Sequence, residues 1–301
     1  MIKNEYEVFA PSGSEQKMVD FIKERVSSKF EKIRIDALGN LICSSGDGGN
    51  CIECGMDTCG VMIVQVDEDK SRFAGVGGIN AEYLISKKIE FKDGNFGFAR
   101  YDGQNAQKTK ICDLYLEGDA ATLKIGDFGV VASQFSEDKN KIYGNGIGNR
   151  VGLSVVLKAL EATEKLENLT VIFSAQKRTK ARGIKAFFTA NKFDRVITID
   201  GAECSGAIKS GNGSFLVVAD KIGKTPKEFA DKITKKADEN GVRLEKAVVD
   251  QDFCMGTIST LGNGAACTAI AVPVNNKNKT VESIEKSDID ECVKLIKALI
   301  N

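Results

Sequence analysis

Histidine is absent from this chain of 301 residues. Its absence excludes a Ser-His-Asp triad, a Cys-His dyad and every metal centre that uses imidazole ligands. Any catalysis would therefore depend on carboxylate, lysine, cysteine, serine or tyrosine side chains. Proline is also scarce, with 3 residues, which argues against long disordered linkers.

An excess of one charge and a long apolar run are both lacking as well. The 42 Lys and Arg residues balance 42 Asp and Glu residues, so the basic surplus typical of nucleic-acid binders is missing. No apolar run reaches the length of about 18 residues that a membrane helix needs. The segment Met1–Glu5 has no apolar core of a signal peptide. We therefore expect a cytoplasmic protein that binds neither nucleic acid nor membranes.

Nine cysteines are present, an odd number that is typical of reduced thiols. Cys51 and Cys54 form a CxxC motif with Cys59 nearby, which raises the alternative of a thiolate metal site. The motif lies in a stretch that resembles a β-strand, where residues three apart point to opposite faces. We therefore expect buried thiols at these positions and no bound metal.

The second half of the chain alternates between strand-like and helix-like segments. Apolar residues recur at helical spacing over 151–166 and in the final segment after Ser287, while 169–175, 196–200, 214–219 and 266–272 are apolar strand candidates. A helix is also expected over 181–191 and another after Pro226. This alternation predicts an α/β fold with a mainly parallel or mixed sheet flanked by helices.

The segment 61–140 differs in pattern, because short alternating runs are separated by Gly, Asn, Asp and Lys clusters. This pattern predicts a small all-β barrel or sandwich. We therefore expect an α/β domain formed by 1–60 and 141–301, with 61–140 inserted as a β domain.

A glycine-rich segment opens the helix predicted at 151. Gly146, Gly148 and Gly152 give the spacing GxGxxxG, and the next strand ends in Gln176-Lys177-Arg178. A glycine-rich loop followed by basic residues after the next strand, which could meet a 2′-phosphate, indicates an alternative function, NADP binding. Only Ile142-Tyr143 precede the loop as an apolar strand.

Charged residues gather at the predicted carboxyl ends of two strands. Asp200 ends the strand 196–200, and Lys177 with Arg178 follows the strand 169–175. Ligands of open α/β sheets bind at this edge. We expect an ion-paired edge here.

Several motifs in order resemble the family of glutamyl, deblocking and tetrahedral aminopeptidases, which are co-catalytic metallopeptidases. They are Ala10–Glu15, Asp36–Leu41, Gly55–Met62, Val76–Ile79, Ile125–Asp127, Asn149–Gly152, Arg182–Ile184, Val272–Val274 and Asp288–Asp290. The resemblance implies an aminopeptidase- and phosphorylase-like α/β domain interrupted by a small β domain. It also implies two divalent metals held by His and carboxylate ligands, with a Glu general base that activates the bridging water.

This chain departs from that pattern at most of the implied catalytic positions. The general-base position holds Lys177, and the orienting aspartate is kept as Asp57. Of the five metal-ligand positions only the fourth keeps a carboxylate; in chain order they hold Gly55, Gly148, Arg178, Asp200 and Asn278. A single carboxylate is too little to hold a divalent metal tightly. The resemblance therefore implies a pseudoenzyme without metal, cofactor or intact catalytic residues, in which Lys177 pairs with Asp200 or Asp57.

The remaining polar residues of the cleft suggest a binding role. Lys177, Arg178 and Arg150 would attract an anionic small molecule or peptide. The alternative is a filled, inert cleft in a protein that acts through its surface. By resemblance, we also expect a homo-oligomer formed through the β domain, or association with an active relative. The enzymatic alternative is residual or altered peptide hydrolysis that uses Asp57, Asp200 and a cysteine.

Overall fold

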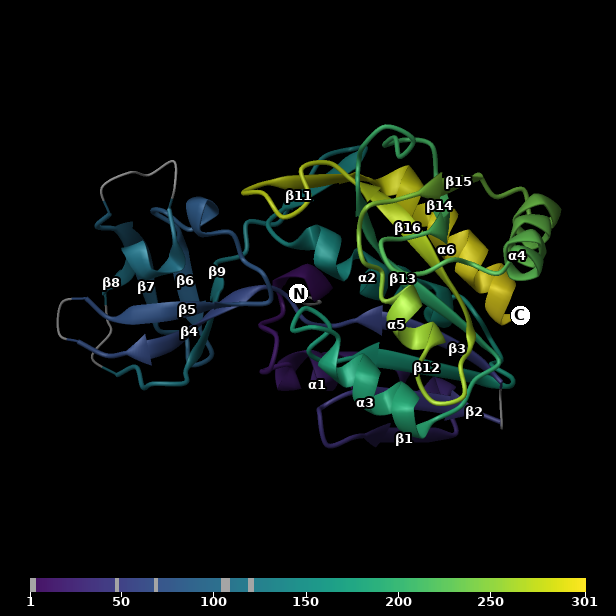
Figure 1. Cartoon of the computed structure of the whole chain (residues 1–301), viewed down its shortest axis with the longest axis horizontal. Helices are drawn as coiled ribbons and strands as arrows, with labels where there is room; N and C mark the ends of the chain where they lie inside the picture. Colours follow the sequence, from purple (N-terminus) through teal and green to yellow (C-terminus); the bar gives the residue numbers. More distant parts are fainter. Residues whose placement is uncertain (1–3, 47–48, 68–69, 104–108, 119–121) are drawn as a thin grey trace.

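The computed structural model of the chain describes all residues except 1–3, 47–48, 68–69, 104–108 and 119–121. A large part with helices on both faces of a sheet lies on the right of Figure 1, and a smaller sheet lies on the left. The first described residues, from Asn4 on, and the C-terminal residues both belong to the larger part.

An eight-stranded mixed sheet forms the larger part. Its four inner strands β12, β3, β13 and β16 are mutually parallel, β2 and β14 flank them antiparallel, and β1 and β15 are the edges. In sheet order the strands are β1 (Lys32–Ile35), β2 (Leu41–Ser45), β12 (Leu169–Ser174), β3 (Asn50–Gly55), β13 (Arg195–Glu203), β16 (Ala266–Val274), β14 (Ser214–Ala219) and β15 (Leu244–Val248). Three of the inner strands, β3, β12 and β16, are almost wholly buried, as is typical of parallel strands covered on both faces, whereas β13 is partly exposed. The prediction of an α/β fold with a mixed sheet is confirmed.

Among the described residues, six α-helices cover the two faces of this sheet, and two hydrophobic cores show which helix covers which face. The core of one face contains apolar residues of α1, α2, α4 and α6, whereas the core of the other contains those of α3 and α5. The helices are α1 (Gln16–Val26), α2 (Ile147–Glu161), α3 (Arg182–Ala190), α4 (Lys227–Glu239), α5 (Met255–Ser259) and α6 (Lys286–Ile300).

Helix α2 packs on the sheet more closely than a side chain would allow. A Cβ atom at Gly152 would overlap the carbonyl oxygen of Ile199 on β13, and one at Gly201 would come 2.5 Å from the carbonyl oxygen of Gly148. Glycine is the residue that permits such an approach of two backbones. The first turn of α2 is thereby fixed against the carboxyl half of β13.

A six-stranded sheet forms the smaller part, and all its strand pairs are antiparallel. It has its own hydrophobic core, in which Ile63, Leu84, Ile89 and Leu116 are buried. In chain order its strands are β4 (Gly60–Gln65), β5 (Arg72–Val76), β6 (Lys88–Phe91), β7 (Phe96–Tyr101), β8 (Leu114–Gly118) and β9 (Phe128–Val131). A three-stranded antiparallel sheet joins β10 (Ser136–Glu137), β11 (Lys141–Gly144) and β17 (Glu282–Glu285).

Several elements differ from the sequence-based expectation. Helix α2 begins at Ile147 and ends at Glu161, four and five residues earlier than predicted. β15 and the short helix α5 were not expected; β15 is an edge strand whose exposed residues break the apolar pattern. Short 3-10 helices occur at Glu5–Glu7, Ser27–Lys29, Ala81–Tyr83 and Ile111–Asp113.

In the part of the chain that the structure describes, no helix combines the length and the apolar character needed to cross a membrane.

Candidate functional site

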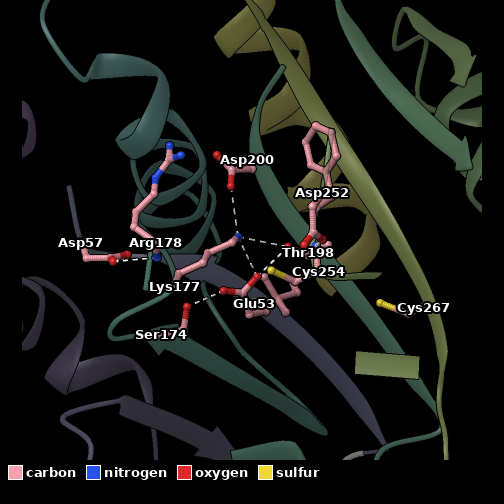
Figure 2. A network of polar contacts seen from close by, with 12 residues as sticks. Glu53, Asp57, Ser174, Lys177, Arg178, Thr198, Asp200, Asp252, Cys254 and Cys267 are labelled. Carbon is pink, nitrogen blue, oxygen red and sulfur yellow. Dashed lines mark hydrogen bonds and ion pairs between the residues drawn. The ribbon is translucent and has the colours of Figure 1, made fainter. Parts of the chain in front are cut away.

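Lys177 is the centre of a buried ionic cluster at the carboxyl ends of the parallel strands (Figure 2). It follows β12, and its side chain is 7% exposed. The Nζ atom lies 3.0 Å from Oε2 of Glu53 and 3.2 Å from Oδ2 of Asp200. It also lies 3.3 Å from the hydroxyl of Thr198. The ammonium group thus bridges two carboxylates that belong to neighbouring strands, β3 and β13.

Glu53 binds the ammonium group of Lys177 from strand β3. It is fully buried on β3, and its Oε1 accepts a hydrogen bond of 2.5 Å from the Ser174 hydroxyl. Its Oε2 accepts a second bond of 2.5 Å from the Thr198 hydroxyl. Strands β12 and β13 flank β3, so their hydroxyls reach Glu53 from both sides. A buried charge that is paired and fully hydrogen-bonded in this way avoids most of its desolvation cost.

The protonation states of the cluster follow from this geometry. Burial alone would lower the pKa of Lys177, but the carboxylates of Glu53 and Asp200 raise it above its ordinary value. Burial would likewise raise the pKa of Asp200, whereas Lys177, Lys277 and Arg178 lower it to about 2. Near neutral pH the Lys177 amine is therefore protonated, which excludes it as a nucleophile or general base.

The side chain of Lys177 fills the space beside Gly55. A Cβ atom at position 55 would come 2.7 Å from Cδ of Lys177. The small residue at the end of β3 and the long residue after β12 are therefore complementary in volume. Gly148 is enclosed in a similar manner, because a Cβ there would lie 3.2 Å from Oε2 of Glu282 and 3.3 Å from Cγ of Lys277.

Asp57 is not a partner of Lys177, although that pairing was one of the two expected. It is 1% exposed, and its Oδ2 accepts the backbone N–H of Arg178 at 2.9 Å. Burial raises its pKa, while the backbone N–H and the guanidinium of Arg178 lower it. Asp57 thus fixes the backbone of the loop that carries Lys177 (Figure 2).

Arg150 does not join the cationic group predicted from the sequence. Its Nη1 donates to the backbone oxygens of Glu5 and Tyr6, at 3.0 Å each. Burial lowers its pKa to about 10. Arg150 thus anchors the N-terminal segment, and binding of one ligand by Lys177, Arg178 and Arg150 together stays a prediction.

Asn278, the fifth position at which the family resemblance implies a metal ligand, lies at the surface. Asn278 is exposed, has a φ of 61°, and donates its backbone N–H to Oε1 of Glu282 at 2.6 Å. Its neighbour Lys277 reaches inward instead, where its Nζ donates to the backbone oxygen of Gly201. Burial lowers the pKa of Lys277, and Asp200 opposes that effect.

Glu53, Thr198 and Ser174 were missed by sequence reasoning. Glu53 lies inside the CxxC motif, which was interpreted through its two cysteines alone. A signal was available, since a charged residue inside an apolar strand needs a buried partner. Residues two apart share a strand face, and Glu53, Thr198 and Asp200 lie on the face that α3 and α5 cover.

The two alternative motifs take different places in the fold. Cys51 packs in the core beneath α3 and α5, and Cys54 packs in the core of the opposite face, so the two thiols point apart as expected. No group of three or more His, Cys, Asp or Glu residues suited to a metal occurs in the described ranges. Strand β11 before α2 pairs antiparallel with β10 and β17, whereas a dinucleotide fingerprint requires a parallel βαβ unit.

A pocket of about 390 Å3 lies outside the ionic cluster. Its lining comes from the N-terminal segment, the start of α2, and strands β6 and β9 of the smaller sheet. Lys177, Arg178 and Asp200 are not among the lining residues. The buried cluster and the accessible pocket are therefore separate features.

The lowered pKa of Asp200 predicts an acid-sensitive contribution to stability. Because the pKa falls from 3.8 to about 2 on folding, this contribution is present above pH 4 and is lost as the pH falls through 2. We expect a loss of about 1 kcal/mol at pH 3 and about 2 kcal/mol near pH 2. Urea unfolding of the wild type and of Asp200→Asn at pH 5, 3 and 2 measures it as a shrinking difference between the two proteins. A constant difference would contradict the assignment.

Comparisons with known proteins agree with the fold. A protein of Acetivibrio thermocellus, whose name assigns it provisionally to the aminopeptidases, is 27% identical over 307 residues, covering 95% of this chain and 93% of its own. Aminopeptidase APDkam598 from Desulfurococcus kamchatkensis has a TM-score of 0.91 at 22% identity, with 99% of this chain and 93% of that chain covered. The TET1 peptidase of Pyrococcus horikoshii, described as assembling into a tetrahedron or a large octahedral shell, has a TM-score of 0.88 at 22% identity over 98% and 96% of the two chains.

The family model described as M42 glutamyl aminopeptidase matches residues 39–295 of this chain. That range includes every strand of the larger sheet except β1 and also the whole smaller sheet. The resemblance inferred from the sequence motifs is confirmed. The chain belongs to the M42 glutamyl aminopeptidase family.

Proposed function

We propose that this chain is a non-catalytic member of its family, a protein that binds an anionic peptide or small molecule rather than hydrolysing peptides with metals. The observation that carries the proposal is the buried ammonium of Lys177, held 3.0 Å from Glu53 and 3.2 Å from Asp200. A cation bonded to both carboxylates competes directly with a divalent metal for the same oxygens.

The residues around this cluster do not fit a pair of divalent metals. Of the five positions at which the family resemblance implies ligands, only Asp200 carries a carboxylate, and that carboxylate is paired with Lys177. The space beside Gly55 is filled by the methylene chain of Lys177. We therefore derive no metal-dependent step for this chain.

Metal content tests the proposal. Protein purified without chelator, incubated with zinc and cobalt and then desalted is expected to keep less than about 0.1 metal per chain, because the ligand set is incomplete. Elemental analysis by mass spectrometry gives the count, and release of p-nitroaniline from leucine p-nitroanilide measures peptidase activity. A stoichiometric metal, or metal-dependent turnover, would refute the proposal.

The alternative of altered hydrolysis with a cysteine receives less support. Cys54, the thiol nearest to Glu53 in sequence, is buried, and burial raises its pKa well above its ordinary value. A protonated, buried thiol is a poor nucleophile. Asp57 and Asp200 are engaged by Arg178 and Lys177, respectively.

We also propose that 61–140 is an inserted domain that serves in assembly. Two solved relatives are described as a dodecamer and as a tetrahedral or octahedral particle, and β7 of this chain exposes Phe96 and Phe98 on its outer face. Exposed aromatic residues are enriched at interfaces. Light scattering after gel filtration is expected to give a mass of two or more chains, and a monomer at micromolar concentration would oppose this.

A further inference from the structure

The pocket lined by the N-terminal segment, the start of α2 and the smaller part of the fold combines apolar and polar walls. Buried or half-buried apolar side chains contribute to its lining, among them Phe9, Ile79, Leu84, Phe91 and Val131. They come from the N-terminal segment and from the smaller sheet, so both parts of the fold are needed to form it. A volume of about 390 Å3 lies in the range of sites for small organic molecules or short peptides.

Lysines dominate the charged lining of this pocket. They are Lys17, Lys87, Lys92 and Lys279, and none forms an ion pair with any residue that the structure describes. Lys17 donates to the backbone oxygen of Lys92 at 2.6 Å, which brings two of these residues together.

The acidic residues of the lining are fewer and mostly engaged. Glu90 pairs with Lys88 at 2.7 Å. Glu282 is fully buried and accepts the backbone N–H groups of Gly148 and Asn278, at 2.6 Å each. Only Glu7 remains as an exposed acid. The rim therefore carries an excess of uncompensated positive charge, which favours an anion.

Asn149 supplies a buried polar group to the lining of the pocket. It is 7% exposed and belongs to the first turn of α2. Its Nδ2 faces the sulfur of Cys59 at 3.8 Å, and its Oδ1 has no hydrogen-bond partner in the described parts of the chain. Buried amide oxygens are normally satisfied. An N–H donor from a bound molecule would satisfy this one.

We infer that this pocket binds a short peptide with apolar side chains and a free C-terminal carboxylate. The side chains pack against Phe9 and Phe91, a peptide N–H donates to Oδ1 of Asn149, and the carboxylate is held by the lysines of the rim. A fatty acid would match the apolar walls and the charge, but it has no N–H for Asn149. The inference rests on the proposed non-catalytic binding role and moves the anion site away from Lys177.

Calorimetric titration with three probes tests the ligand class. N-acetyl-leucyl-phenylalanine is expected to bind at least about tenfold more tightly than its C-terminal amide, because only the acid engages the rim. Decanoate is expected to bind more weakly than the acid peptide. Equal affinity for the acid and the amide, or a preference for decanoate, would overturn the inference.

Two variants locate the binding site. Reversal of two rim charges in K87E/K279E is expected to lower the affinity for the acid peptide about tenfold. The control K232E, on the exposed surface of α4, is expected to leave this affinity unchanged. Asn149→Leu is expected to lower the affinity for the acid peptide about fivefold, which corresponds to the loss of one hydrogen bond. Since Asn149 is buried and its replacement could unfold the protein, the rim variant decides the outcome. An unchanged affinity in K87E/K279E would contradict the site.

Mass spectrometry of the incubated peptide separates this inference from the proposed function. Intact peptide together with binding supports both. Cleavage of the peptide in the presence of zinc would refute the non-catalytic role, whatever the affinity. Intact peptide without binding would overturn only the pocket assignment.

Discussion

Replacing Lys177 with methionine is expected to lower the free energy of unfolding by about 3 to 5 kcal/mol. Methionine keeps the chain length that fills the space beside Gly55, so packing is largely preserved. The change leaves the carboxylates of Glu53 and Asp200, which now lie 3.0 and 3.2 Å from the ammonium, without their cation. Urea unfolding at pH 7, followed by circular dichroism, measures the loss.

A matched control lies on the next helix. Lys185 is exposed on α3, and Lys185→Met is expected to change stability by no more than about 0.5 kcal/mol. The double variant E53Q/K177M is expected to be more stable than K177M, because the glutamine adds no buried negative charge. A loss below about 1 kcal/mol in K177M would show that the ammonium does not support the two carboxylates.

The fold could be predicted from the sequence because the patterns that indicate its strands and helices are local. The apolar runs at 169–175, 196–200 and 266–272 became the inner parallel strands β12, β13 and β16, since strands buried on both faces must be continuously apolar. The edge strand β15 escaped prediction because its residues alternate poorly and most are exposed. Its strand conformation depends on pairing with β14, which is a tertiary effect.

The candidate site was accessible only in part. The approach of Lys177 to Asp200 followed from their shared sheet edge, and it is present at 3.2 Å. The role of Glu53 depended on which strands flank β3, and chain order does not reveal that β12 and β13 lie on either side of it. The contacts of Arg150 could not be predicted, because helix periodicity does not show that its guanidinium reaches the backbone of Glu5 and Tyr6.

Introducing a histidine at position 55, where the family resemblance implies a metal ligand, is expected on its own to destabilise the protein by about 2 to 3 kcal/mol. The new Cβ would come 2.7 Å from Cδ of Lys177, and that side chain is held in place by Glu53 and Asp200, so it is not free to move aside. Lys177→Glu alone is expected to cost about 5 kcal/mol or more, since it adds a third carboxylate to the cluster. Thermal and urea unfolding of both single variants measure these losses.

The double variant G55H/K177E is expected to be stabilised by zinc. The wild type and the two single variants are expected to show no such stabilisation. The double change releases the side chain at position 177 from its ion pairs with Glu53 and Asp200, so that this side chain can move away from the new imidazole. It also brings an imidazole and a carboxylate beside Asp200 and Glu53, a ligand set that zinc accepts. Zinc at about 100 times its dissociation constant adds about 2.7 kcal/mol of stability, or about 5 °C in melting temperature for a chain of this size. G55H/K177Q, which lacks the new carboxylate, serves as the control. If the wild type were stabilised by zinc to the same extent, Lys177 would not be what keeps metal from these carboxylates, and the proposed function would fail with it.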